Sequence, residues 1–245
     1  KPCDIAGVRN LARLDPRVDR QVVATISFFC AGLPSLDVSR AIIAKYGLVE
    51  SEIALLRYRG MGCPGPTRIE ARDGRAFEQT YQETWSSELT RGVQFRCKIC
   101  PDSTGEQADL VAGDAWAGGE GNPLDDSAGH NLVIARSERG QALLEDMVAA
   151  GVLAVEAADA RDLEAMQPNH ARRKRQLLAR LAGLLASGEP MPRYSRLGLA
   201  RAALSGIAGW SRSMRGTMAR VRNGNNREHL PDTARPEFEE AGAQQ

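Results

Sequence analysis

The 245-residue chain has no long apolar run, and no apolar segment of the kind found in secretory signal peptides lies near its start. These absences argue against a transmembrane segment or an export signal, so we expect a cytoplasmic protein. Its five cysteines are too few for a disulfide scaffold, and their odd number favours reduced thiols. The formal net charge of +1 indicates no strongly charged partner.

Several catalytic signatures are also missing. The sequence has no GxSxG serine and no phosphate-binding loop motif, and its three histidines, His130, His170 and His229, lack the spacing of metal ligands. We expect these histidines in loops or in the C-terminal tail, as surface residues. Serine–histidine catalysis therefore has little support.

Strand-like and helix-like patterns alternate along the first two thirds of the chain. Strands are predicted over residues 22–29, 53–58, 67–71, 75–81, 108–112, 131–135 and 152–155. Helices are predicted after a capping residue, Ser35 or Asp37 for the first and Ser137 for the second, and Asp73-Gly74 predicts a hairpin turn. This alternation predicts an α/β domain over residues 1–158, with a mixed sheet flanked by helices.

Arginine is concentrated in the last third of the chain, and the composition changes from residue 159. Residues 171–185 predict one basic amphipathic helix, and residues 197–222 predict a second arginine-rich helical stretch. The first helix could face an acidic partner, a membrane surface or nucleic acid, but we favour a helix packed on the core with solvated arginines. We therefore expect a basic helical extension over 159–222 and a disordered tail over 223–245.

The cysteines are the strongest chemical signal. Cys97 and Cys100 form a CxxC motif whose tight turn can direct both sulfurs to one centre. Cys3 lies near the amino end of an expected helix, where the helix dipole favours a thiolate, although it could be a plain loop cysteine. Cys30 follows the expected strand 22–29 and could instead be a buried core thiol. Cys63 lies in a loop rich in glycine and proline.

Two kinds of metal centre suit these thiols. Four thiolates can hold an iron–sulfur cluster or a structural zinc ion. Zinc ribbons usually contain two paired motifs, whereas here only Cys97 and Cys100 are paired. Ligands drawn singly from distant strand ends suit a cluster better, although a CxxC motif also serves redox thiols.

Two other features indicate a ligand site. The glycine-rich loop after Arg59 has backbone amides that, with this arginine, could hold an anion such as a cofactor phosphate, although a plain turn is the simpler interpretation. The strand at 108–112 is expected to end at Gly113-Asp114 and to present a carboxylate where ligands of α/β sheets often bind. Residues 117–129 are expected to form a loop, either a mobile cover over a site or a surface loop.

Five segments in one order resemble the carboxy-terminal domain of the coenzyme F420 hydrogenase/dehydrogenase beta subunit family. They are Lys1-Pro2-Cys3-Asp4-Ile5-Ala6-Gly7, Phe28-Phe29-Cys30-Ala31-Gly32-Leu33-Pro34-Ser35, Tyr58-Arg59-Gly60-Met61-Gly62-Cys63-Pro64-Gly65, Cys97-Lys98-Ile99-Cys100-Pro101-Asp102, and Ala108-Asp109-Leu110 with Gly113-Asp114-Ala115-Trp116. The resemblance extends over about residues 1 to 155, and the arginine-rich remainder adds nothing specific to it.

The resemblance implies an iron–sulfur flavoprotein that transfers electrons between a flavin, expected to be FAD, a [4Fe-4S] cluster and a redox partner protein or small-molecule donor or acceptor. Coenzyme F420 is then a candidate substrate. By position, the resemblance assigns Cys3, Cys30, Cys97 and Cys100 as cluster ligands, and it ranks Cys63 fifth, as a substitute ligand or a free thiol.

For the flavin contacts implied by the resemblance, we expect Arg59, Asp114 and Asn131. The family's amino-terminal region, which in many members carries a ferredoxin-like cysteine motif, is absent from this sequence. We therefore expect either a fragment or a chain that works with a partner chain supplying that region. The alternative is a non-catalytic accessory or interaction module with a structural zinc or vestigial cysteine site. Neither interpretation involves nucleic acid or a transmembrane segment.

Overall fold

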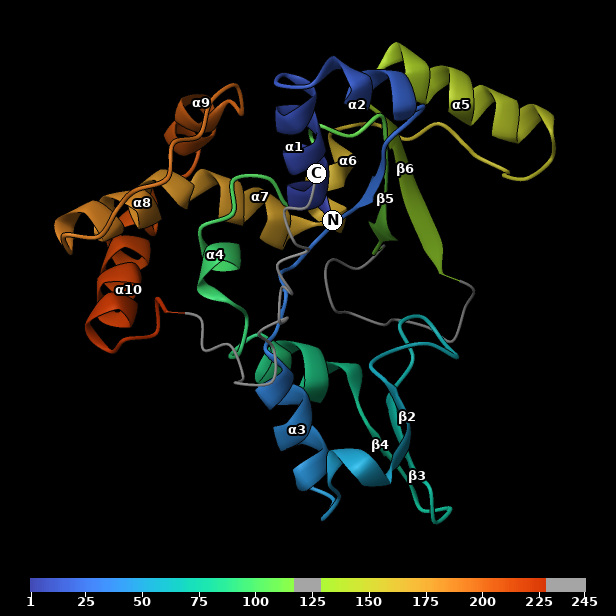
Figure 1. The fold of residues 1–245 in the computed structure, drawn as a ribbon, viewed down its shortest axis with the longest axis vertical. Coiled ribbons are helices and arrows are strands. Elements are labelled where there is room, and N and C mark those ends of the chain that lie inside the picture. Colours follow the sequence, from blue (N-terminus) through green and yellow to red (C-terminus); the bar gives the residue numbers. More distant parts are fainter. Residues whose placement is uncertain (117–128, 228–245) are drawn as a thin grey trace, which may run out of the picture.

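A computed structural model describes residues 1–116 and 129–227 (Figure 1). In Figure 1 one sheet, with β1, β5 and β6, lies in the upper half, and a second sheet lies below it beside α3. Helices α8, α9 and α10 gather on one side of the upper sheet. No helix of the described residues is long and apolar enough to cross a membrane.

The upper sheet is mixed, as the sequence predicts, with the strand order β1-β5-β6. Strand β1 (Ile26–Phe28) runs parallel to β5 (Leu110–Ala115), and β5 pairs antiparallel with β6 (His130–Ala135). Strand β1 is shorter than the expected run 22–29, because the amide of Thr25 donates a hydrogen bond to a carboxylate and β1 begins only at the next residue. Strand β5 does not end at Gly113-Asp114 as expected, because its pairing with β6 extends to Ala115.

Four helices lie around this sheet. They are α1 (Pro2–Ala12), α2 (Pro16–Gln21), α5 (Glu138–Ala149) and α6 (Asp162–Met166). Ser137 caps α5 as predicted, since its side chain accepts a hydrogen bond from the amide of Gly140. The expected strand at 152–155 is wrong: Val152 and Val155 are exposed in an irregular segment, where an unpaired strand would gain no burial.

The lower sheet is antiparallel and separate from the first, whereas the sequence pattern predicts one sheet. It has the order β2-β3-β4, with β2 (Ile53–Arg57), β3 (Thr67–Ala71) and β4 (Ala76–Gln79). The hairpin at Asp73-Gly74 is confirmed. Three helical segments accompany this sheet: α3 (Leu36–Ala44), a 3-10 turn (Glu50–Glu52) and a π-helix (Gln82–Leu89).

A hydrophobic core of its own stabilises the lower sheet. Ile42 of α3, Ile69 of β3 and Leu89 of the π-helix are almost fully buried against one another. The hairpin can therefore bury its apolar face without joining the upper sheet.

The basic extension contains α6 and four further helices instead of the two expected stretches. They are α7 (Pro168–Arg175), α8 (Leu177–Ala186), α9 (Leu199–Leu204) and α10 (Trp210–Arg222). The expected helix 171–185 is interrupted at Gln176, whose side chain accepts a hydrogen bond from Ser213 of α10. The expected helical stretch 197–222 is interrupted before Gly209, which has the positive φ of +94°. Most of the expected disordered tail, residues 228–245, lies outside the described residues.

Helix α8 joins the extension to the CxxC segment. Its buried Leu177 and Leu181 pack against Phe95 and Ile99, which lie in and just after the one-turn helix α4 (Phe95–Lys98). The extension is thus packed on the segment that carries the paired cysteines.

Candidate functional site

The CxxC segment holds its two cysteines in partly buried positions. Cys97 lies within α4, and its sulfur accepts a hydrogen bond from the amide of Leu33 at 3.4 Å. The sulfur of Cys100 lies 3.0 Å from the carbonyl oxygen of Asp102, to which the thiol donates. Burial raises the pKa of the Cys100 thiol to about 11. Without a bound cation this group is therefore a neutral thiol at neutral pH.

Cys30 follows β1 at its carboxyl end, as the sequence predicts. Its amide donates to the carbonyl of Ser103 at 2.9 Å, which fixes the backbone beside the CxxC segment. Gly32 has a φ of +126°, and a Cβ atom there would lie 3.2 Å from the Cβ of Cys97 and 2.6 Å from Val93. Only glycine allows the Cys30 loop to approach the Cys97 helix this closely.

Arg173 of α7 binds both cysteine segments at once. One of its terminal nitrogens, Nη1, donates to the carbonyl of Ala31 at 2.6 Å and to that of Cys30 at 3.4 Å. The other, Nη2, donates to the carbonyl of Cys97 at 2.7 Å. The guanidinium therefore holds two segments together that are far apart in the sequence.

The expectation that the arginines of this helix are solvated does not hold for Arg173. One feature of the sequence does point to these contacts of Arg173. Proline is common at the first position of a helix, and in a helix that begins at Pro168 the side chains of His170 and Arg173, three residues apart, lie on the same face.

The thiols influence one another electrostatically. Burial raises the pKa of the Cys30 thiol; the Gly32 amide and the Arg173 guanidinium oppose the shift, and Cys97 and Cys3 add to it. Cys3 itself is exposed in the first turn of α1, as predicted for a residue at a helix amino end. Thiols from three distant parts of the chain are therefore close enough to affect one another's ionisation.

This arrangement can be tested against the two metal centres considered above. Among residues 1–116 and 129–227, no group of three or more His, Cys, Asp or Glu side chains could hold a metal ion. A tetrahedral zinc site needs sulfurs only about 3.8 Å apart, given Zn–S bonds of about 2.3 Å. A four-iron cluster is wider and accepts thiols spaced farther apart. Among the described residues, the thiols therefore form no ready-made tetrahedral zinc site.

Cys63 lies elsewhere, in the loop between β2 and β3. It is next to Gly129 and close enough to Arg59 to interact with it electrostatically. Its surroundings are thus those of Arg59, not those of the CxxC turn.

A cavity of about 460 Å³ opens beside Cys30, and three residues expected at a ligand site line it: Arg59, Asp114 and Asn131. Asp114 of β5 and Asn131 of β6 are direct partners in the sheet register. Arg59 donates to both carboxylate oxygens of Asp114, at 2.8 and 2.6 Å, and this pairing raises the pKa of Arg59. Because Asp114 neutralises Arg59, the arginine is poorly placed to hold a phosphate.

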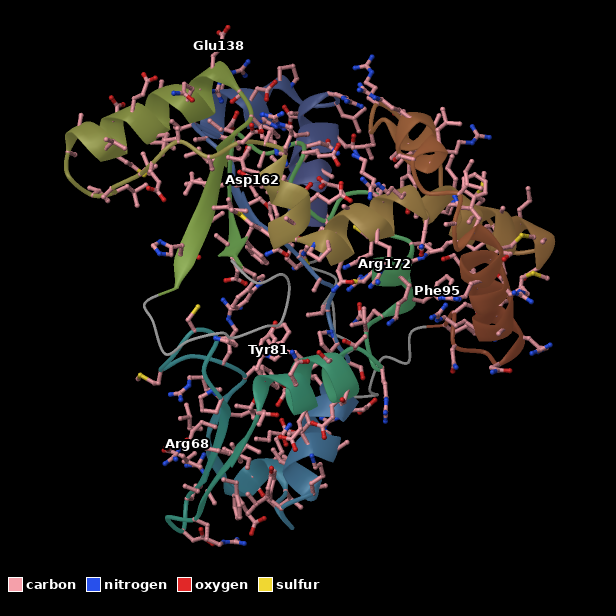
Figure 2. All side chains as sticks on the ribbon, turned by 180° about the vertical axis from the view of Figure 1, so that it is seen from behind. Arg68, Tyr81, Phe95, Glu138, Asp162 and Arg172 are labelled. Carbon is pink, nitrogen blue, oxygen red and sulfur yellow. The ribbon has the colours of Figure 1, made fainter. Side chains whose placement is uncertain are left out.

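Aromatic rings form much of the cavity wall. They belong to Phe28, Phe29, Tyr81, Trp85 and Trp116. Tyr81 stacks on Trp85 with a centroid distance of 5.5 Å, and the guanidinium of Arg59 lies over Trp116. Tyr81 lies between the two sheets (Figure 2). A flat, conjugated ligand would find stacking surfaces here with polar groups at its edge.

The first turn of α7 and the residue before it complete the cavity. Gln167, Asn169 and His170 line it, and the Gln167 side chain donates to the carbonyl of Asp114 at 2.6 Å. None of these three is expected at the site from the sequence, because their place depends on how the start of α7 meets the end of β5.

The expectation that His170 is a surface loop residue is wrong. It lies in α7 with 7% of its surface exposed, 2.9 Å from the hydroxyl of Ser103 and against the ring of Phe29. Burial lowers the pKa of its imidazole to about 4, with Arg173 adding to the shift. His130 is also not in a loop, since it begins strand β6, and His229 lies outside the described residues. The expected cover loop, 117–129, lies almost entirely outside them as well.

Comparison with known proteins agrees with the resemblance described above. The sequence model of the family described as the C terminus of the coenzyme F420 hydrogenase/dehydrogenase beta subunit matches residues 1–161. The chain belongs to this family. Among curated proteins, the coenzyme F420 hydrogenase subunit beta of Methanococcus voltae is 27% identical over 155 residues, which are 62% of this chain and 49% of that protein. The chain therefore spans about half the length of this relative of the beta subunit family.

Among solved structures, a chain of the F420-reducing [NiFe] hydrogenase complex from Methanosarcina barkeri matches with a TM-score of 0.41 and 19% identity. The match covers 61% of this chain and 46% of that one. Helices α7 to α10 lie beyond the 161 residues that match the beta subunit family.

Proposed function

We propose that this member of the beta subunit family is an oxidoreductase subunit that holds a [4Fe-4S] cluster next to a flavin, expected to be FAD. The cluster ligands would be Cys3, Cys30, Cys97 and Cys100. The observation that carries the proposal is the position of Cys30, which Arg173 joins to the CxxC segment on one side and which lines the aromatic cavity on the other. A cluster and a flavin in these places would be close neighbours.

The residues of the chain have separate tasks in this proposal. The aromatic rings would sandwich the flavin ring and exclude water, while Asp114 and Asn131 would contact polar atoms at its edge. Arg173 would keep the Cys30 and Cys97 backbones in register. The amide of Leu33, already bonded to the Cys97 sulfur, would help to stabilise charge on that sulfur. When bound, the flavin supplies two-electron chemistry and the cluster one-electron transfer.

Coenzyme F420 is a candidate two-electron substrate because the curated relative is named for it. The redox partner is proposed to be a further protein chain, one that could also supply the amino-terminal region expected from the family. Both statements depend on the parts of the relative that this chain does not span.

The test is the iron and acid-labile sulfide content of the chain purified without oxygen. We expect roughly four irons and four sulfides per chain, a large loss with Cys97→Ser, and little change with Cys63→Ser, the matched control. Stoichiometric zinc without sulfide would refute the cluster. The absence of both metals would favour the accessory or interaction module.

The flavin site has its own test, a titration with FAD followed by flavin fluorescence. We expect weaker binding by Asp114→Ala than by the wild-type chain, because the variant loses the carboxylate proposed to contact polar atoms at the edge of the flavin ring. Equal affinity of the two proteins would remove Asp114 from the site.

A further inference from the structure

A second cavity, of about 470 Å³, has an unusual charge. Its cationic lining residues come from α7, α8, α10 and the CxxC turn: Lys98, Arg172, Arg173, Arg180, Arg212 and Arg220. No carboxylate is among the described residues that line it. We call this cavity, with its six cationic side chains, the basic cleft.

The cations of the basic cleft have no acidic partners within the described part of the chain. None of the ion pairs found there includes any of the six, although Arg175, also on α7, pairs with Glu164. Arg180 donates instead to the carbonyl of Lys98 at 2.6 Å, and Lys98 donates to the carbonyl of Thr90. Burial and the like charges of Arg173, Arg220 and Arg172 lower the pKa of Arg180 to about 10.

Gathering like charges in a partly enclosed space costs free energy of folding. A multiply charged anion would offset this cost, and guanidinium groups are well suited to phosphate oxygens because they donate two parallel hydrogen bonds. The volume of the cleft is in the range of small-molecule sites. The cations line a concave space and not an extended exposed stripe, which favours a compact anion over a nucleic-acid strand.

The basic cleft adjoins the aromatic cavity. Five residues line both: Ala31, Gly32, Trp85, Thr90 and Asn169. A single ligand with a flat ring in one cavity could place a charged tail in the other. Arg59 offers no comparable site, since Asp114 already occupies both of its terminal nitrogens.

We propose that the basic cleft binds the diphosphate group of a small molecule. The helices that supply five of its six cations lie beyond the part of the chain that matches the beta subunit family. The extension would thus add a phosphate-binding site to the family's domain. The diphosphate could belong to the flavin dinucleotide of the proposed function or to a separate ligand.

The test is calorimetric titration of the full chain with inorganic pyrophosphate. The double variant Arg212→Gln/Arg220→Gln removes two cleft charges from α10. The matched control, Arg215→Gln/Arg222→Gln, removes two charges from the same helix at positions that do not line the cleft. We expect at least tenfold weaker binding by the cleft variant and less than a twofold change for the control.

Three results would overturn the proposal. They are no pyrophosphate binding by the wild-type chain, equal losses in the two double variants, and binding of an oligonucleotide or an acidic protein in place of pyrophosphate. Far-UV circular dichroism and a urea unfolding curve of each variant show whether a loss of binding reflects a loss of fold. A third cleft variant, Arg180→Lys, keeps the charge but loses the fork of donors, and should bind more weakly than wild type.

A competition experiment separates the two sources of the diphosphate. If it belongs to the flavin dinucleotide, saturation with FAD abolishes pyrophosphate binding. If it belongs to another ligand, pyrophosphate binds with unchanged affinity in the presence of FAD. Iron content tests the cluster independently: a cleft that fails to bind pyrophosphate in a chain that still holds iron refutes this proposal alone.

Discussion

Replacing Asp109 by asparagine should destabilise the upper sheet more than any exposed charge substitution. The residue lies one position before β5 with 4% of its surface exposed. One carboxylate oxygen accepts hydrogen bonds from the amide of Thr25 at 2.8 Å, the hydroxyl of Thr25 at 2.7 Å and Arg9 of α1 at 3.0 Å. The other oxygen accepts from Ser137, the cap of α5, at 2.7 Å. Asp109 therefore ties two helices to the start of β1.

The expected loss of stability can be worked out from the pKa of Asp109. Burial alone would raise it, but the hydrogen bonds from Ser137 and Thr25 and the charge of Arg9 outweigh burial and lower it to about 2, from an ordinary value of 3.8. Since the folded state favours the ionised form, this group stabilises the protein above pH 4 by roughly 2.5 kcal/mol. The contribution falls as the pH drops through the folded pKa, and about half of it remains at pH 3.

The assay is urea unfolding of wild type and Asp109→Asn at pH 7 and pH 3. We expect a loss of about 2 to 3 kcal/mol at pH 7, and a smaller difference between the two proteins at pH 3. Asp159→Asn is the control, because this exposed carboxylate pairs, within the described part of the chain, with Arg161 alone, and its replacement should leave the free energy of unfolding nearly unchanged. Equal shifts for the two variants, or a difference that does not depend on pH, would refute the reasoning.

Two further substitutions test the packing around the cysteines. Gly32→Ala should lower the free energy of unfolding by more than about 2 kcal/mol and lower the iron content, because the new Cβ has both an unfavourable φ and close neighbours. The control, Gly74→Ala, has a positive φ but open space around the new Cβ, and should lower the free energy of unfolding by only about 1 kcal/mol. Urea unfolding and iron analysis of the variants test both. His170, with its pKa lowered to about 4 by burial, binds a proton more readily in the unfolded chain. Stability should therefore fall by roughly 3 kcal/mol as the pH drops from about 6.5 to 4, and His170→Gln should remove this dependence; an imidazole NMR signal of His170 that titrates near pH 6.5 would contradict it.

Local patterns were enough to predict most of the strands and the turn between β3 and β4. Periodicity and turn residues act over a few positions, so Ser137 and Asp73-Gly74 were identifiable from their neighbours alone. The division into two sheets was not predictable in this way, because it depends on whether the hairpin finds its own apolar cover, which Ile42 of α3 and Leu89 of the π-helix provide. The interruption of the basic helix at Gln176 likewise reflects a contact with α10.

The candidate site shows the same limit. Arg59, Asp114 and Asn131 could be placed near a strand edge from sequence, and the structure brings them to one cavity, although their role in flavin binding stays a prediction. Arg173 and His170 could not be assigned, because each acts on a segment about 70 or more positions away in the chain. A solvated arginine and one that binds three carbonyl groups look alike in a sequence.

The contacts of Arg173 also set an order for events during synthesis. The chain leaves the ribosome with its amino end first, so Cys3, Cys30, Cys97 and Cys100 are all exposed to the cell before α7 has been made. Until then, nothing from the extension fixes the distance between the Cys30 loop and the CxxC turn. If these thiols hold the proposed cluster, the site becomes fully stable only after the last third of the protein has been synthesised. A shortened chain that ends at residue 161 would keep every thiol but lose the Arg173 contacts that join the Cys30 loop to the CxxC turn.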